Sequence, residues 1–408
     1  MKSRCDLLAP DAPAGTEILQ LTEGDLPSSH IYMEAQIFTP DSSRFILHES
    51  AHAHGSDKLD PKHRYLVCDL NDHYALHPLT DETGATAPSV SPDGRFVYYF
   101  TDQTKPGGGS LTLKRVNIDG SDRVTVLTVD APLPATDYRP SRLYPLSTIR
   151  SDGKRIALSC FLGDGQREEQ PFGLMIFNLE TPAVELVLSG PSWCNIHPQY
   201  SRSTDEEHFR DLLIQENHGN TANPAGDIQR LVGGDGADIH VIRDDGSDFR
   251  DMPWGRDGNE FCQGHQCWHG QSPWAITSTG TKDPDEQQLI ASLPVAASNH
   301  RGLAAPNGQR NHLSRSFSQP CFYHFATDNT GRRLVSDTGR QDQGGRIFLA
   351  DFGEKPLDAL SSWTCLAHPR SSWDKQAHIH PFLSPDGTRA FFNSDESGVL
   401  QTYIIDNL

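Results

Sequence analysis

Long apolar runs, an excess of basic residues and closely spaced cysteines are all missing from this sequence. No stretch approaches 18 consecutive apolar residues, so no membrane-spanning helix is expected. Acidic residues outnumber basic ones by 54 to 35, and the net charge of −19 argues against nucleic acid and anionic membrane surfaces as partners. The eight cysteines include no Cys-x-x-Cys pair, so we expect free thiols.

Sustained helical periodicity is missing as well. No segment keeps apolar residues at a spacing of 3.6, which leaves strands and turns as the main elements. The 34 glycines and 28 prolines among 408 residues indicate a globular chain rich in turns, long enough for one large all-β domain. The first residues lack the apolar core of a signal peptide, so a cytoplasmic location is expected.

A turn signature recurs along the chain. Its clearest form is Ser384-Pro385-Asp386-Gly387, whose Pro, Asp and Gly favour a tight turn between two hydrophobic runs. The copies are mostly about 50 to 60 residues apart, close to the length of one propeller blade. Six clear copies are Thr39–Ser42, Ser91–Gly94, Arg150–Gly153, Ser201–Asp205, Thr327–Gly331 and Ser384–Gly387, and a weaker one lies near Ser278–Gly280.

Two β-rich runs follow each clear turn. Strand, turn, strand, connection and strand, repeated seven times, predict an all-β fold: a seven-bladed β-propeller that spans residues 1–408 as a single domain. The segment from Met1 to about Thr22 is expected to supply a strand that closes the ring. Asn217–Gly236 and Ala296–Pro320 are predicted to be inserted loops, and such loops on one face of a propeller often carry function.

Histidines recur at one position of the repeat. His324 and His380 both lie seven residues before the glycine of their turn, and His197 occupies the same frame in the fourth copy. In the first three copies the position holds Ala35, Ala87 and Leu146. The strand before this turn is the innermost strand of a propeller blade. These histidines are therefore expected beside the central channel.

His378 and His380 form a His-x-His pair, and side chains two residues apart on a strand point to the same face. Together with His324 they predict a metal site. Gln376 shares the face of His378 and would add an oxygen ligand. Such a donor set suits Mn, Fe, Zn or Ni and leaves positions open to substrate oxygens. The alternative is a set of channel-lining histidines without metal.

A second group of histidines precedes the fifth turn. In Glu260–His269, an imidazole at His265 and an indole at Trp268 would give a base beside an aromatic wall. The alternative is a core tryptophan with a structural histidine. His218, in Asn217-His218-Gly219, follows a strand at the start of the first long loop and is a weaker candidate.

Several stretches resemble the oligogalacturonate lyase family. The most specific runs from Ser371-Ser372-Trp373 through His378-Ile379-His380-Pro381 to Asp395. The others are His197–Ser201, Asn217–Gly219, Gly264–Trp268, Cys321–Phe325 and Leu334–Asp337. The resemblance extends from roughly Thr22 to Leu408, although the first three blades match mainly in repeat form, and it implies a seven-bladed propeller that degrades pectin fragments.

The resemblance also implies roles for individual residues. The family's Mn²⁺ ligands, three histidines and a glutamine, fall on His324, His378, His380 and Gln376. Its catalytic base falls on His265. The family pattern places the glutamine three residues before the histidine pair, where this chain has Lys375. The loop Ala296–Pro320 is extra.

The family's arginine against substrate charge is missing from the matching strand. Arg230 or Arg243 is expected to take its place. The expected substrate-binding residues are His197, His218, Arg230, Arg243 and Trp268.

The reaction implied is β-elimination across a 4-linked uronide. The C5 proton is acidic because it is alpha to the C6 carboxylate, and an imidazole of ordinary pKa, about 6.5, can accept it. The substrate is then a small acidic oligosaccharide, which binds Mn²⁺ through its carboxylate. The alternatives are a lyase for a different uronic acid and a non-catalytic sugar- or protein-binding propeller. A serine hydrolase is disfavoured because no Gly-x-Ser-x-Gly motif is present.

Overall fold

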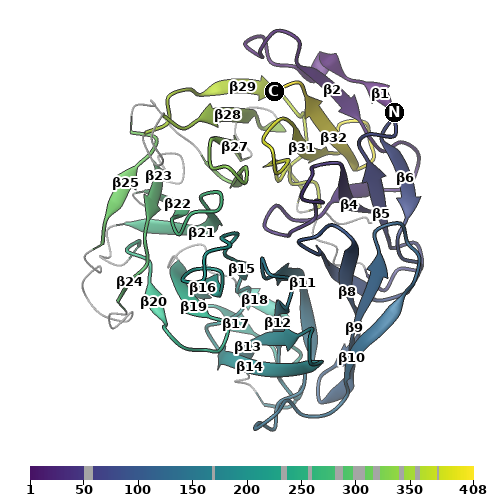
Figure 1. Cartoon of the computed structure of the whole chain (residues 1–408), viewed down its shortest axis with the longest axis vertical. Helices are drawn as coiled ribbons and strands as arrows, with labels where there is room; N and C mark the ends of the chain where they lie inside the picture. The colour runs from purple at the N-terminus through teal and green to yellow at the C-terminus, as the bar shows by residue number, and fades with distance from the viewer. Residues whose placement is uncertain are drawn as a thin grey trace.

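In the computed structural model, antiparallel sheets stand around a common axis like the blades of a propeller (Figure 1). The structure describes residues 1–49, 58–167, 171–230, 237–255, 260–280, 288–296, 308–315, 322–339, 344–353, 359–374 and 376–408. Within these ranges, seven sheets of four or five strands form the ring, beside one short hairpin. The all-β, seven-bladed propeller predicted from the repeats is confirmed.

Each of the first three blades is a meander of four strands. Blade 1 is β3 (Ser28–His30), β4 (Arg44–Glu49), β5 (Arg64–Asp69) and β6 (Ala75–Pro78). Blade 2 is β7 (Ala85–Val90), β8 (Phe96–Lys105), β9 (Gly108–Asn117) and β10 (Val124–Val129). Blade 3 is β11 (Arg142–Ile149), β12 (Arg155–Phe161), β13 (Phe172–Asn178) and β14 (Ala183–Gly190).

The next three blades follow the same order with insertions. Blade 4 is β15 (Gln199–Tyr200), β16 (Asp211–Asn217), β19 (Ala237–Arg243), β20 (Arg250–Asp251) and β24 (Val295–Ala296). Blade 5 is β21 (Phe261–Trp268), β22 (Ala275–Gly280), β23 (Gln288–Ser292) and β25 (Arg310–His312). Blade 6 is β26 (Phe325–Thr327), β27 (Arg333–Asp337), β28 (Ile347–Asp351) and β29 (Thr364–Ala367).

Blade 7 joins the two ends of the chain. Its strands, from the axis outward, are β30 (Phe382–Leu383), β31 (Ala390–Ser394), β32 (Gln401–Asp406), β2 (Glu17–Gln20) and β1 (Lys2–Ser3). A single 3-10 turn, η1 (Cys5–Leu7), connects β1 and β2. Ile18 pairs with Ile405 across the closing strands. The predicted closure of the ring by the N-terminal segment is therefore confirmed.

Ile18 tests how much this closing strand stabilises the ring. The side chain is fully buried in the core cluster that also holds Ile405. Ile18→Ala is expected to lower the free energy of unfolding by about 2–5 kcal/mol, because it removes buried methyl groups and leaves a cavity. Glu17→Ala, at an exposed position of the same strand, is the control. Denaturant unfolding of both variants measures the difference, and equal values would contradict a closing role for Ile18.

The recurring turns share one hydrogen-bond pattern. Ser384 Oγ donates to Asp386 Oδ1 over 2.6 Å, and Ser91 and Asp93 repeat this bond at 2.6 Å. Gly387 has φ +71°, a conformation that glycine adopts without steric cost. The prediction of a weaker turn near Ser278–Gly280 is wrong, because those residues lie inside β22. The turn of blade 5 begins at His269, whose N–H donates to the Trp274 carbonyl, and it carries no aspartate.

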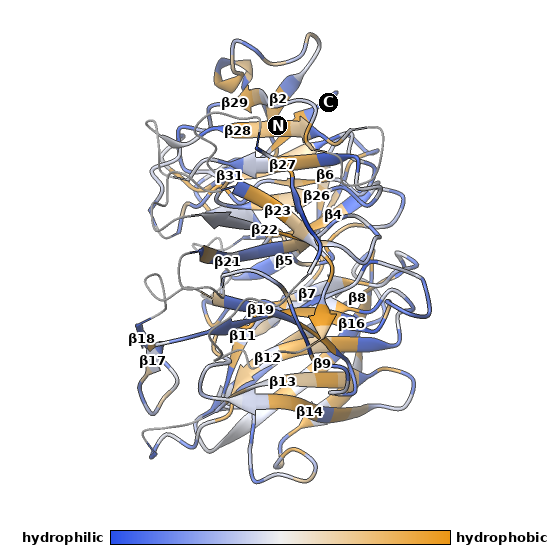
Figure 2. Cartoon of the chain, turned by 90° about the vertical axis from the view of Figure 1, so that its left-hand side faces the viewer, coloured by the Kyte–Doolittle hydropathy of each residue, from blue (hydrophilic) through white to orange (hydrophobic). Residues whose placement is uncertain are grey.

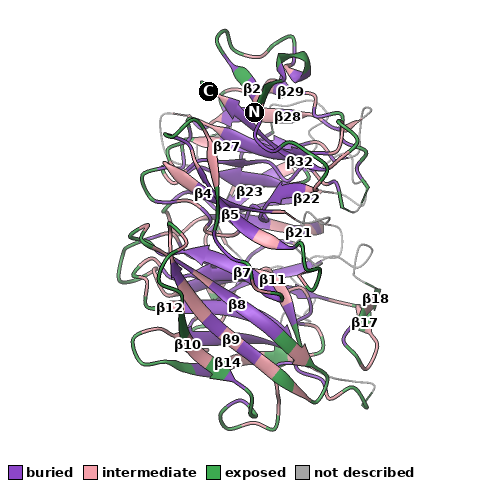
Figure 3. Ribbon diagram, turned by 90° about the vertical axis from the view of Figure 1, so that its right-hand side faces the viewer, coloured by how far each residue is buried: buried purple, intermediate pink, exposed green. Residues whose placement is uncertain are grey.

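Apolar side chains fill the space between blades. The middle strands are apolar and buried in Figures 2 and 3, whereas the outer turns are hydrophilic and exposed. The strand β16, for example, is buried along its whole length. The seven described cysteines are free. No helix among the described residues is long and apolar enough to cross a membrane.

The two predicted loops contain strands. Within Asn217–Gly236, β17 (Thr221–Ala222) and β18 (Ile228–Arg230) form a hairpin that projects from the ring (Figures 2 and 3), while 231–236 lie outside the described residues. Ala296–Pro320 contains β25, the outer strand of blade 5, so this segment is not wholly a loop. Its parts 297–307 and 316–320 also lie outside the described residues.

Candidate metal centre

The turns of blades 4 to 7 place four histidines at one position. Each turn begins with a residue whose N–H donates across the hairpin: Ser201, His269, Asp328 and Ser384. Four residues before these lie His197, His265, His324 and His380. His265 therefore shares the repeat position of the other three. The comparison of the repeats in the sequence missed this equivalence of His265, because it placed the fifth turn near Ser278.

The backbone at this position is irregular in several blades. His197 and His380 have φ of +50° and +46°, and Ala87, at the same position of blade 2, has φ +52°. Such left-handed conformations are costly for residues other than glycine and often occur at functional sites. The prediction that His378 and His380 lie on a regular strand is wrong, since β30 begins only at Phe382. The left-handed turn at His380, not strand alternation, brings the two imidazoles together.

The imidazoles of His324, His378 and His380 converge near the propeller axis, just before the innermost strands of blades 6 and 7 begin. Each offers a ring nitrogen, and these three nitrogens lie within 4.8 Å of one another. The ring centroids of His324 and His380 are 4.2 Å apart. His324 and His380 are buried, whereas His378 is half-buried. This donor set fits one divalent ion with positions left for further ligands.

Asp337 orients one of these histidines. His324 Nδ1 lies 2.8 Å from Asp337 Oδ2, which leaves Nε2 for a metal ion. Asp337 also accepts the backbone N–H groups of His324 and Gly339. Complete burial raises the pKa of Asp337 to about 8, against the opposing effect of those N–H groups. A carboxylate behind a histidine is a common arrangement around bound metals, so the observed residues fit such an ion.

His265 lies beside this triad. Its ring centroid is 4.7 Å from that of His324. The register of β21 shifts between Cys262 and Gln266, which is the mark of a β-bulge, and Gly264 in the bulge has φ +85°. A Cβ on Gly264 would lie 2.7 Å from Gln215 Nε2, and the positive φ also favours glycine there. The bulge therefore directs His265 toward the axis.

Aromatic rings enclose the histidines. The Trp373 ring stacks on His324 with an interplanar angle of 8°, and Tyr323 meets His265 edge-on at 5.3 Å. Tyr323 is 38% exposed and so reaches the surface beside His265. Tyr32 is buried, and its ring centroid is 4.8 Å from that of His380. Burial raises the pKa of the Tyr32 hydroxyl. Composition alone did not single out these tyrosines.

His197 belongs to the inner part of the channel. Its Nδ1 lies 2.8 Å from Glu34 Oε2, and its ring centroid is 5.3 Å from that of Tyr32. Burial raises the pKa of Glu34, and the charge of His197 opposes this shift. The geometry therefore makes His197 the partner of a buried carboxylate.

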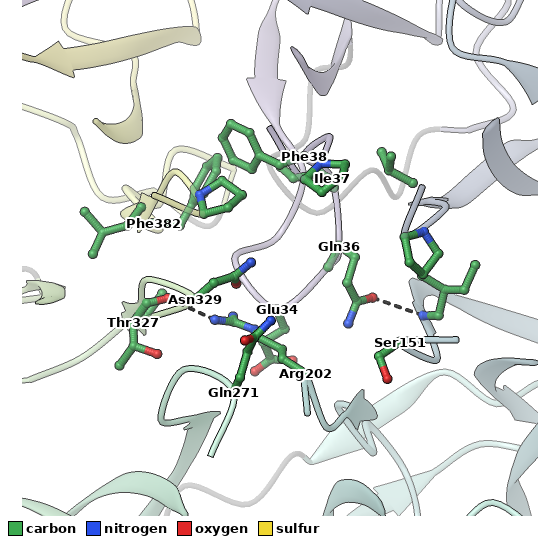
Figure 4. Close-up of a pocket in the computed structure, with 18 of the residues that line it drawn as sticks. Glu34, Gln36, Ile37, Phe38, Ser151, Arg202, Gln271, Thr327, Asn329 and Phe382 are labelled. Carbon is green, nitrogen blue, oxygen red and sulfur yellow. Dashed lines mark hydrogen bonds between the residues drawn. The ribbon is translucent and has the colours of Figure 1, made fainter. Parts of the chain in front are cut away.

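A cavity of about 260 Å³ lies at the other end of the axis, among the recurring turns (Figure 4). Its wall combines apolar residues such as Phe38 with polar residues such as Gln271. Arg202 Nη1 donates to the Thr327 carbonyl over 3.0 Å, and Glu34, the partner of His197, also lines this cavity (Figure 4). Glu34 thus lies between this cavity and the histidines.

The remaining predicted site residues are more scattered. Gln376 is exposed in a turn, and Lys375 lies outside the described residues. Trp268 is 1% exposed and its Nε1 donates to the Gln199 carbonyl, as expected for a core tryptophan. Arg230 is exposed on the projecting hairpin.

Arg243 lies at the other end of blade 4. It pairs in register with Asp211, whereas Ala237 at the opposite end of β19 pairs with Asn217, next to His218. Seven strand residues separate the two ends by about 20 Å. The Arg243 side chain pairs with Asp248, 3.2 Å away. The structure therefore does not bring Arg243 to the histidines.

Comparison with solved structures gives the fold. The chain matches an oligogalacturonate lyase in complex with manganese over 100% of this chain and 96% of that one, with a TM-score of 0.70 and 19% identity. The fold is that of the oligogalacturonate lyases. A second oligogalacturonate lyase, from Vibrio parahaemolyticus, matches over 98% of this chain and 96% of that one, with a TM-score of 0.69 and 17% identity.

A prolyl endopeptidase is less similar to this chain. It matches over 90% of this chain and 49% of that one, with a TM-score of 0.51 and 14% identity. No protein-family model matches the chain, and no curated protein sequence does. The oligogalacturonate lyase resemblance seen in the sequence is thus confirmed by the fold, at a level of identity that marks a divergent chain.

Proposed function

We propose that this chain is a metal-dependent lyase that cleaves 4-linked uronides of the oligogalacturonate type by β-elimination. The observation that carries the proposal is the convergence of His324, His378 and His380 beside a fourth imidazole, His265. The shared fold with two oligogalacturonate lyases supports it. The assignment of Mn²⁺ to the site rests on the first of these, which is a manganese complex.

The residues divide the chemistry between them. His324, His378 and His380 would hold the ion, with Asp337 fixing the ring of His324. When bound, a divalent ion supplies Lewis-acid stabilisation of the charge that develops on the C6 carboxylate. His265 takes the C5 proton, a C4–C5 double bond forms as the C4–O4 bond breaks, and the leaving O4 takes a proton from water. Tyr323 is exposed beside His265 and can contact the sugar ring.

The test is an absorbance assay. Purified protein with Mn²⁺ is mixed with di- and trigalacturonate, and with oligomers of other 4-linked uronic acids. Growth of ultraviolet absorbance is expected, because the unsaturated product is conjugated with its carboxylate. A metal chelator should abolish the signal, and added Mn²⁺ should restore it. No absorbance change with any member of the panel, at full metal loading, would contradict the proposal.

A further inference from the structure

Blade 4 carries a second group of metal-ligating side chains. Glu216 and Asp238 are directly opposite each other in the register of β16 and β19, and His218 follows two residues after Glu216. One oxygen or nitrogen from each of the three lies within 4.8 Å of the others. The carboxylates are buried, with 3% and 9% of their side chains exposed, whereas His218 is 32% exposed. The group therefore has a closed inner side and an open outer side.

Two carboxylates face each other at the centre of this group. Like charges directly opposite across a sheet destabilise it unless a cation lies between them. His218 Nε2 lies 2.8 Å from Asp238 Oδ2, and this one imidazole faces both carboxylates.

A second layer of side chains fixes Glu216. Ser192 Oγ donates to Glu216 Oε1 over 2.5 Å, and His240 Nε2 lies 3.4 Å from Oε2. His240 is fully buried and is itself held by Asp251, whose Oδ1 lies 2.8 Å from His240 Nδ1. Metal-ligating carboxylates are typically oriented by hydrogen bonds of this kind. The arrangement is therefore more than a cluster of acidic groups on a surface.

We propose that Glu216, His218 and Asp238 bind a divalent metal ion at a second site in blade 4. Two carboxylate oxygens and one imidazole nitrogen suit Mn²⁺ or Zn²⁺. The exposed edge of His218 leaves room for water or for a ligand oxygen. Because His218 begins the segment that leads to β17 and β18, the ion also ties the projecting hairpin to the blade.

This site is separate from the histidine triad. Gln215 faces Gly264 of blade 5, whereas its neighbour Glu216 points to the other face of β16, where it meets Ser192. The His240 ring there lies 5.6 Å from Trp193, on the side of blade 3. The inference does not depend on the proposed lyase function.

Metal counting tests the site. Full-length protein is saturated with Mn²⁺ or with Zn²⁺, freed of unbound ion by gel filtration, and measured by elemental analysis. Wild type is expected to hold two ions per chain, and Asp238→Asn and His218→Gln one each. His218→Gln alters a side chain near the surface, so it should fold even if the Asp238 change does not. Glu207→Gln, at a position 75% exposed in the same blade, should keep both ions.

Comparison with His378→Ala separates the two metal sites. An ion that Asp238→Asn loses but His378→Ala keeps supports the blade 4 site, whatever the lyase assay shows. The proposed blade 4 site is wrong if folded Asp238→Asn and His218→Gln each still hold two ions. It is also wrong if wild type holds one ion and only His378→Ala loses that ion. The bound ion should also raise the melting temperature of wild type more than that of His218→Gln, because binding to the folded state alone stabilises it.

Discussion

Replacing His265 with asparagine is expected to lower kcat/KM for an oligogalacturonate about 10²–10⁴-fold, the usual contribution of a positioned general base. The His265 ring lies 4.7 Å from His324, so it is beside the triad without belonging to its converging nitrogens. The variant should therefore bind as much metal as wild type. Steady-state kinetics from ultraviolet absorbance, with elemental analysis of the same samples, measure both quantities.

His77→Asn is the matched control for His265→Asn. His77 is exposed on β6 in blade 1, outside the group of four histidines at the shared repeat position. Its loss should leave both kinetics and metal content unchanged. A His265→Asn enzyme with wild-type kcat/KM would rule out His265 as the base. A His265→Asn protein that has lost metal from the triad would instead make His265 a ligand.

His378→Ala is expected to remove the ion from the triad and to reduce activity at least about 100-fold, the range seen when metal sites lose even their supporting groups. The side chain is half-buried, so its truncation disturbs the core less than truncation of His324 or His380. Wild type stripped by a chelator should behave in the same way, and should recover when Mn²⁺ is returned. The variant should not recover at the same Mn²⁺ concentration.

Recovery with excess ion also separates weak binding from a missing site. If His378→Ala regains full activity at high Mn²⁺, His378 contributes affinity only, and the other two histidines suffice for the reaction. If wild type keeps full activity after complete removal of metal, the Lewis-acid part of the proposed reaction is wrong.

Much of this molecule follows from local sequence rules. The local sequence is enough to predict turns such as Ser384–Gly387, because their residues supply the hydrogen bonds and the positive φ that a hairpin needs. With these turns known, the blades and the register of His324 with His380 followed. The turn of blade 5 lacks an aspartate and was misplaced, which hid the equivalence of His265 until the backbone hydrogen bond of His269 was known.

The rest depends on contacts between residues far apart in the chain. Nothing near Asp337 or Tyr32 in the sequence shows that a histidine packs against either one. The left-handed backbone at His380 was equally hidden, because a residue before proline normally prefers an extended conformation. The blade 4 cluster combines both difficulties, since Glu216 and Asp238 meet only through the pairing of β16 with β19.

Closure of the ring by β2 and β32 has a consequence for synthesis of the protein. The three converging histidines and β32, the strand that receives β2, are all synthesised after the first five blades. The strand β2 therefore lacks this partner until β32 has been made. A chain cut short within blade 7 loses the partner of its first strand together with part of the triad. The fold thus couples the pairing of β2 to the synthesis of the complete histidine site.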